Sequence, residues 1–198
     1  MTESEAGFTP EAGAADPAGP RPLRLTARDA EDLAVLSSML QDAICSPSDI
    51  GFAPRDGLFA LAVNRFCWEA APVRAAAPEE EEEAGTEDAA DLGPVYHRTQ
   101  CGVRFHGVRR VSTRGFRLTD RGRLLSLLAV TVEAGAGAGH GGEGGAEGGG
   151  VTITLTFAGG PRLRLEADAI RASLEDFGTP WPTTRRPRHE IEDAGESD

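Results

Sequence analysis

Lysine is missing from this sequence of 198 residues, and its 20 basic side chains are all arginine. Without lysine the chain cannot hold a phosphate through a P-loop lysine, form a Schiff base or bind a cofactor through an imine. Asparagine is nearly absent too, with Asn64 as its one instance, whereas alanine and glycine are abundant. This bias is typical of a GC-rich genome. The absence of lysine excludes several large enzyme classes without indicating a function.

Cysteine is scarce as well: the chain contains Cys45, Cys67 and Cys101. The number is odd, the three are widely separated and none forms a C-x-x-C pair, so the sequence predicts neither a disulfide framework nor a metal site. Cys67 and Cys101 lie in apolar, strand-like runs. We interpret them as small core residues.

Long hydrophobic runs and targeting signals are also lacking. Residues 1–22 are acidic and rich in alanine, glycine and proline, with neither a basic start nor an apolar stretch. No run approaches the roughly 20 apolar residues that span a bilayer. We therefore expect a cytoplasmic protein without membrane contact.

The net charge of −12 is unevenly distributed. Acidic residues without hydrophobic periodicity gather at both termini, in a run from 72 to 94 that contains Glu79–Glu83, and among the glycines of 134–150. The remaining chain is mildly basic, most strongly over 95–133. This distribution predicts a disordered tail (1–22), a single domain (23–190) with flexible inserts (72–94 and 134–150), and a disordered acidic tail (191–198).

The first half of the domain predicts a strand, a helix and a hairpin. The strand begins at Leu23, and the helix follows over 30–44, capped by Asp29, with leucines at helical spacing. The hairpin joins 49–53 to 58–68 through a Pro-Arg-Asp-Gly turn. The second strand is apolar on both faces, so we expect it to be central and covered on both sides. Its apolar pattern is interrupted at Asn64 and Arg65, which suggests a bulge.

The second half alternates with period two in runs that predict strands over 101–113, 124–133, 151–157 and 163–167. Apolar residues at 170, 174 and 177 then predict a short C-terminal helix that begins at Asp168. Together these elements predict an α+β fold: a largely antiparallel sheet of about seven strands, an early helix and a C-terminal helix. We expect the topology of a pleckstrin-homology-like roll.

Motifs for catalysis are weak. Gly137, Gly139 and Gly142 spell G-x-G-x-x-G, but a strand follows them instead of the helix that would receive a pyrophosphate. His106 and Cys101 are five residues apart on one strand and therefore point to opposite faces. The sequence predicts no catalytic residue, metal or cofactor, and it leaves the oligomeric state open.

The feature in excess of structural need is a basic strand face formed by Arg104, His106, Arg110 and Arg114. Their positions differ by even numbers, so on one strand they would project together and attract an anionic partner, either an acidic protein or a nucleic acid. Few aromatic residues accompany them, which argues against base stacking. The leading hypothesis is a non-enzymatic binding or adaptor domain. A solvated charged face is the plainer interpretation, and an enzyme of unrecognised type with a carboxylate and histidine pocket is the alternative.

The acidic block Glu79–Glu83 enters the chain shortly before this strand. We expect it to fold back over the basic face and to compete with anionic partners, so that its removal strengthens binding and salt weakens it.

Several blocks of the chain resemble a bacterial family, the domain of unknown function 2948. The resemblance is carried by Phe-Ala-Leu-Ala-Val-Asn-Arg-Phe-Cys-Trp-Glu at 59–69 and by Arg-Arg-Pro-Arg-His at 185–189, with Gly-Thr-Pro-Trp at 178–181 between. It spans roughly 23–190 without the two inserts. It implies a bacterial cytoplasmic protein and transfers no catalytic or binding residue.

Overall fold

A computed structural model describes residues 20–74, 94–134 and 150–187. Most of both tails and of both inserts lies outside these ranges, and the disorder expected there remains a prediction. The described residues form one α-helix, one 3-10 turn and twelve strands. Their bounds are β1 (Arg24–Ala27), α1 (Ala30–Met39), β2 (Ile44–Cys45), η1 (Pro47–Asp49), β3 (Ile50–Ala53), β4 (Leu58–Phe66), β5 (Val73–Arg74), β6 (Pro94–His106), β7 (Val108–Arg114), β8 (Leu125–Ala134), β9 (Val151–Phe157), β10 (Arg162–Ala167), β11 (Ala172–Asp176) and β12 (Trp181–Thr183).

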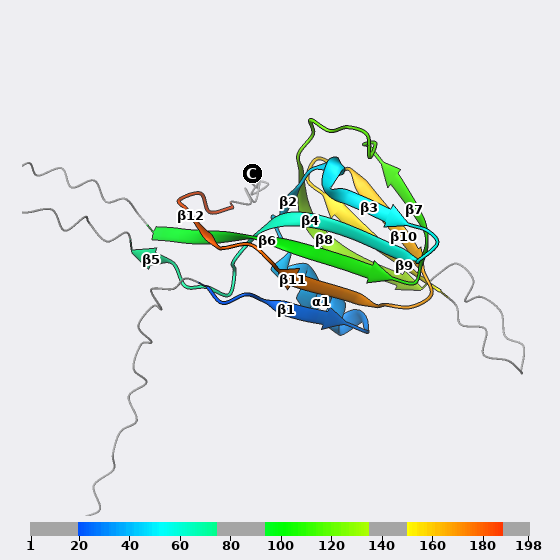
Figure 1. Cartoon of the computed structure of the whole chain (residues 1–198), viewed down its shortest axis with the longest axis horizontal. Helices are drawn as coiled ribbons and strands as arrows, with labels where there is room; N and C mark the ends of the chain where they lie inside the picture. The colour runs from blue at the N-terminus through cyan, green and yellow to red at the C-terminus, as the bar shows by residue number, and fades with distance from the viewer. Residues whose placement is uncertain (1–19, 75–93, 135–149, 188–198) are drawn as a thin grey trace, which may run out of the picture.

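The strands follow one path of antiparallel neighbours, β1-β11-β6-β4-β2-β8-β9-β10-β7, with β3 beside β4 and with β5 and β12 beside β6. This path bends into two layers that face each other (Figure 1). We call β1, β11, β6, β4 and β3 the first layer, and β8, β9, β10 and β7 the second. The two-residue strand β2 joins them on one side. On the other side the chain passes directly from β6 into β7 at Gly107, whose φ of +71° suits glycine.

Helix α1 fills the opening between the layers, where it contacts β1 and β8. Asp29 caps it as the sequence predicts, because its carboxylate accepts a hydrogen bond of 2.8 Å from the backbone N–H of Asp32. Leu33 and Leu36 of the helix and Leu40 after it are buried among the inward side chains of both layers. The helix thus completes a single hydrophobic core.

The predicted hairpin is confirmed by the strand register: β3 and β4 pair Ala53 with Leu58 across their turn. The strands predicted over 124–133, 151–157 and 163–167 are also present, as β8, β9 and β10. They form a meander in which Leu155 of β9 lies between Val130 and Leu163. Period-two alternation was a reliable signal here because one face of each strand lies in the core.

The α+β class with a C-terminal helix is wrong: the described chain is mostly β, with α1 as its one α-helix. Residues 172–176 form strand β11 between β1 and β6, so the pleckstrin-homology-like roll with its closing helix is wrong too. Ala172, Leu174 and Asp176 point inward at period two. The aspartate at an inward position conceals this alternation in the sequence, and Phe177, the last residue of the predicted helical pattern, is 61% exposed.

The bulge suggested at Asn64 and Arg65 is also wrong. Strand β4 keeps an unbroken register with β6 from Leu58 to Phe66, so Arg65 points inward like Leu61. Nor is β4 covered on both sides by described residues, because Asn64 is exposed on its outer face.

Candidate functional site

The four predicted site residues are all exposed, but they do not share one face. Arg104 and His106 lie on β6 in the first layer, whereas Arg110 and Arg114 lie on β7 in the second. The chain turns between the layers at Gly107, and the pairing of β7 with β10 shifts register between Glu166 and Ala167. An even spacing along the sequence predicts a shared face only within one continuous strand.

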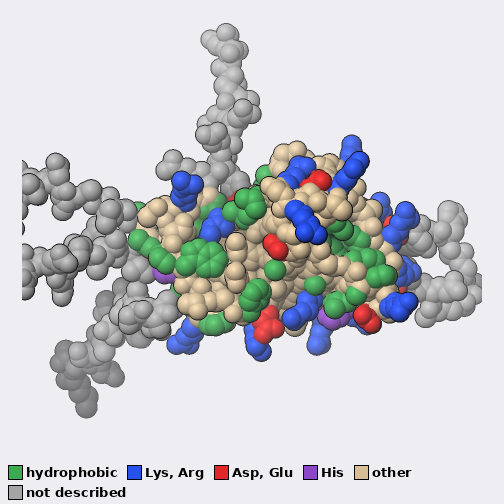
Figure 2. Space-filling view, turned by 45° about the horizontal axis from the view of Figure 1, so that its top comes forward, with side chains coloured by type: hydrophobic (Ala, Val, Ile, Leu, Met, Phe, Trp, Pro, Cys, Tyr) green, Lys and Arg blue, Asp and Glu red, His purple; other side chains and the backbone are tan. Residues whose placement is uncertain are grey.

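In the first layer, a nearby carboxylate partly neutralises the charge of Arg104. Its Nη1 lies 3.7 Å from a carboxylate oxygen of Glu175, which also forms an ion pair with Arg24 of β1. His106 stands opposite Leu58 on β4. Figure 2 looks onto this layer and the end of the molecule beside it. Basic side chains there lie mostly toward the periphery, and hydrophobic side chains interrupt them.

The outer face of the second layer is different, since arginines and hydroxyl side chains stand there in adjoining rows. Arg114 of β7 is directly opposite Arg162 of β10, which is opposite Thr156 of β9. The next row contains Ser112, Arg164 and Thr154. We call these six residues the arginine–threonine face. Together with Thr113, Thr131 and Glu133, they line a hollow of about 480 Å³.

The arginines of this face have no acidic partner among the described residues. Arg164 donates a hydrogen bond of 3.2 Å to the hydroxyl of Thr152, and neither Arg114 nor Arg162 forms an ion pair within the ranges that the structure covers. Like charges directly opposite each other on neighbouring strands destabilise a sheet. A bound anion would relieve that repulsion, and the surrounding hydroxyls can donate to its oxygens.

A second hollow of about 220 Å³ lies on the outer face of the first layer. Its floor includes Ala62 and the amide side chains of Asn64 and Gln100, and the exposed side chains of Leu124 and Phe177 stand beside it. Neither of these two hollows includes a histidine, and each contains a single carboxylate, Asp49 in this one and Glu133 in the other. The described residues therefore offer no support at either hollow for the alternative of a carboxylate and histidine pocket.

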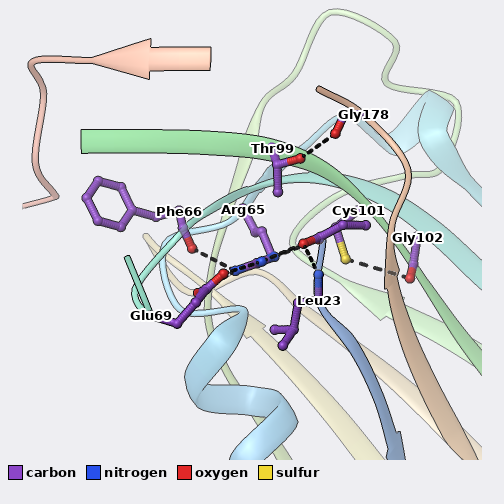
Figure 3. Close-up of polar contacts among 9 residues, drawn as sticks. Leu23, Arg65, Phe66, Glu69, Thr99, Cys101, Gly102 and Gly178 are labelled. Carbon is purple, nitrogen blue, oxygen red and sulfur yellow. Dashed lines mark hydrogen bonds and ion pairs between the residues drawn. The ribbon is translucent and has the colours of Figure 1, made fainter. Parts of the chain in front are cut away.

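Sequence reasoning missed a buried ionic cluster beneath the first layer, shown in Figure 3. Arg65 is fully buried and contacts Asp176 of β11 and Glu69, with Nη2–oxygen distances of 2.6 and 2.7 Å. Burial alone would lower the pKa of Arg65, but hydrogen bonds and attraction from these two carboxylates raise it above its ordinary value. Asp176 also accepts a hydrogen bond from the backbone N–H of Leu23. The cluster joins three distant segments, and its arginine and aspartate side chains are buried.

The three cysteines are buried, as the sequence suggested for Cys67 and Cys101. Burial raises the pKa of Cys45 and Cys101 to about 12 and that of Cys67 to about 11, so all three thiols stay protonated near neutral pH. Because the thiolate is the reactive form, these cysteines are poor nucleophiles. Within the ranges described, no three His, Cys, Asp or Glu side chains come together in a way that could hold a metal ion.

Comparison with family models decides the relationship. The model described as "Protein of unknown function (DUF2948)" matches residues 23–189. The chain belongs to this family. The resemblance seen in the sequence is thereby confirmed, and the DUF2948 match extends over both layers and α1. Neither the curated proteins nor the solved structures yielded a match. No helix in the described residues has the length and apolar character needed to cross a membrane.

Proposed function

We propose that this DUF2948 protein is a non-enzymatic binding domain that holds an anionic partner on its arginine–threonine face. The observation that carries the proposal is the pair of Arg114 and Arg162, directly opposite each other and without a carboxylate partner among the described residues. Arg164, two residues along β10, extends the positive charge over the same hollow. A sheet gains nothing in stability from such a cluster, so a role in binding accounts for it better.

The other half of the predicted basic face is a weaker candidate. Arg104 has Glu175 at 3.7 Å, and Arg110 stands opposite Glu166 of β10. Both arginines therefore carry a neighbouring negative charge that reduces their attraction for an anion. The proposal keeps Arg114 of the residues predicted from sequence and adds Arg162 and Arg164.

Binding of a fluorescent oligoglutamate peptide to the whole chain tests this function. The variant Arg114→Gln/Arg162→Gln/Arg164→Gln is expected to lose at least tenfold in affinity at low salt. The matched control Arg28→Gln/Arg55→Gln/Arg171→Gln removes the same charge from exposed positions outside the face and is expected to retain the affinity. Equal losses in both variants would show that net charge, rather than this face, attracts the peptide.

Thermal unfolding of the same variants separates binding from folding. Removal of Arg114 and Arg162 relieves a like-charge contact, so the triple variant is expected to unfold at the same temperature as the parent chain or above it. A variant Arg104→Gln/His106→Gln tests the first layer independently. Loss of binding in that variant alone would move the site to β6.

A further inference from the structure

We propose that the anionic partner is an acidic, extended protein segment that pairs with the free edge of β7 as an additional strand. This inference rests on the proposed function and names the partner of the same site. The path of strands ends at β1 and at β7. Strand β1 has four residues, whereas β7 has seven and pairs with β10 on one side only among the described strands.

The edge of β7 is suited to strand addition because it contains no proline, and every residue after Val108 is at least partly exposed. Unpaired N–H and C=O groups along such an edge can bond to an added strand. The β3–β4 turn touches the edge only at its start, where the N–H of Val108 donates to the carbonyl of Gly57 at 2.9 Å.

The side chains of β7 define which segment would fit. Arg110, Ser112 and Arg114 point to the outer face, and Val111 points toward the core and packs against it. An added strand places its own side chains about 5 Å from these, with every second residue on the outer face. Acidic residues at alternate positions would therefore meet Arg114 and, more weakly, Arg110, whose charge is already reduced by Glu166 on its other side. Small apolar residues between them would meet Val111.

A second copy of this chain would bring its own outward arginines to the same edge, so it is a poorer occupant than an acidic strand, most clearly in one register. In an antiparallel pair of two β7 strands centred on Ser112, Arg110 of each copy stands opposite Arg114 of the other. Like charges opposite each other disfavour this pairing. The same arginines that repel a second copy attract an acidic strand, and this complementarity decides between the two occupants.

The acidic block Glu79–Glu83 lies outside the described residues, so its expected cover of the basic face stays a prediction. The segment that contains it begins after Arg74 and ends before Pro94, and these two residues pair at the start of β6. Strands β5 and β7 lie at opposite ends of the molecule (Figure 1). The test below includes removal of this segment.

Nucleic acid is the other anionic polymer to consider. The arginine–threonine face has positive charge for its phosphates but no aromatic ring on which its bases could stack. Proteins that bind single strands stack bases on exposed aromatic rings. The arginine–threonine face contains none, and Phe116, the aromatic residue that follows β7, is buried against Phe157. The face therefore fits carboxylates on a strand better than bases.

The test compares three nine-residue peptides with the whole chain by titration calorimetry. The first alternates glutamate with valine or threonine, the second has the same composition with its glutamates consecutive, and the third is the first with alternate backbone nitrogens methylated. We expect the first to bind at least tenfold more tightly than either of the others. Amide hydrogen exchange of β7 residues is expected to slow with the first peptide alone.

The outcomes separate this inference from the function on which it rests. If all three peptides bind equally and the Arg114→Gln/Arg162→Gln/Arg164→Gln variant binds none, the face binds anions but strand addition is refuted. If the variant binds as the parent does, the proposed function fails with it. Tighter binding of a 12-nucleotide RNA than of the first peptide would overturn the choice of a protein partner. Faster exchange of β7 on removal of 75–93 would show that this segment already occupies the edge.

Discussion

Arg65 donates hydrogen bonds to both carboxylate oxygens of Asp176, at 2.7 Å from Nε and 2.6 Å from Nη2, although 111 positions separate the two residues. The contact joins β4 to β11, which are not neighbours because β6 lies between them. Asp176 thus supplies the negative charge that stabilises the buried Arg65 side chain, and Arg65 supplies the positive charge that stabilises the buried Asp176 side chain. Each would be costly in the core without the other.

Removal of the charge of one partner should therefore strongly lower the free energy of unfolding. Asp176→Asn leaves the Arg65 charge buried with Glu69 alone, and we expect a loss of about 3–5 kcal/mol in the free energy of unfolding, measured by urea denaturation. Glu175→Gln is the matched control, because among the described residues its half-exposed carboxylate pairs with two exposed arginines, Arg24 and Arg104. The control should change stability by about 0.5 kcal/mol or less. Similar losses in both variants would refute a special role for the buried pair.

The same pair shows where sequence reasoning reached its limit. Strands whose inward residues are all apolar, such as β9 and β10, were predicted with nearly correct bounds. Arg65 and Asp176 each interrupt an inward row of apolar residues, so the pattern at Arg65 predicts a bulge and the pattern at Asp176 conceals β11. The position of each residue is explained only by its contact with the other. A contact across 111 positions leaves no signal in the local sequence pattern.

The candidate site was predicted in part for a related reason. Alternation placed Arg114 correctly on an exposed strand face, but it could not show that β10 supplies Arg162 directly opposite. It also extended one face through Gly107, where the chain turns into the other layer. Pairing between strands, rather than composition, brings the site together.

The aromatic residues Trp181 and Phe177 should contribute differently to stability when each is replaced by alanine. Trp181 begins β12 opposite Arg98 and is partly buried, whereas Phe177 is 61% exposed beside Gly102. A fully buried tryptophan ring would predict a loss of about 3–5 kcal/mol for Trp181→Ala. Partial burial reduces our expectation to about 2 kcal/mol, and Phe177→Ala should cost less than about 1 kcal/mol. Chemical denaturation of both variants measures the difference, and a larger loss for Phe177→Ala would contradict it.

Stability should fall in alkaline solution because the three thiols are buried. Burial holds the pKa of Cys67 near 11 and those of Cys45 and Cys101 near 12, whereas a thiol of the unfolded chain titrates near 9. The unfolded chain therefore loses these protons first. The contribution is fully present below pH 9 and is lost as pH rises from about 9 to 12, with a slope of up to about 1.4 kcal/mol per pH unit for each thiol.

Urea denaturation at pH 8, 9 and 10 measures this slope. Cys45→Ala removes one of the thiols, so its free energy of unfolding should fall less steeply with pH than that of the parent chain. The comparison depends on slopes, and a uniform loss of stability in the variant does not affect it. Parallel pH dependences for the two proteins would show that Cys45 does not contribute.

The two inserts are expected to be dispensable for folding, because neither has the apolar residues needed to offset the entropy of ordering. Strand pairs Arg74–Pro94 and Ala134–Val151 close both segments, so the deletion should retain these pairs. Gly150 should stay as well, since a Cβ there would lie 2.7 Å from the carbonyl oxygen of Ala167.

Replacement of 76–92 and 136–148 by a few glycines and serines should then leave the thermal midpoint unchanged or slightly higher. Halving a loop lowers its closure entropy by only about 0.6 kcal/mol. Gly150→Ala in the full chain is the control for damage at the border and should lower the midpoint, and a loss of several degrees in the double replacement itself would show that the inserts contribute folded structure.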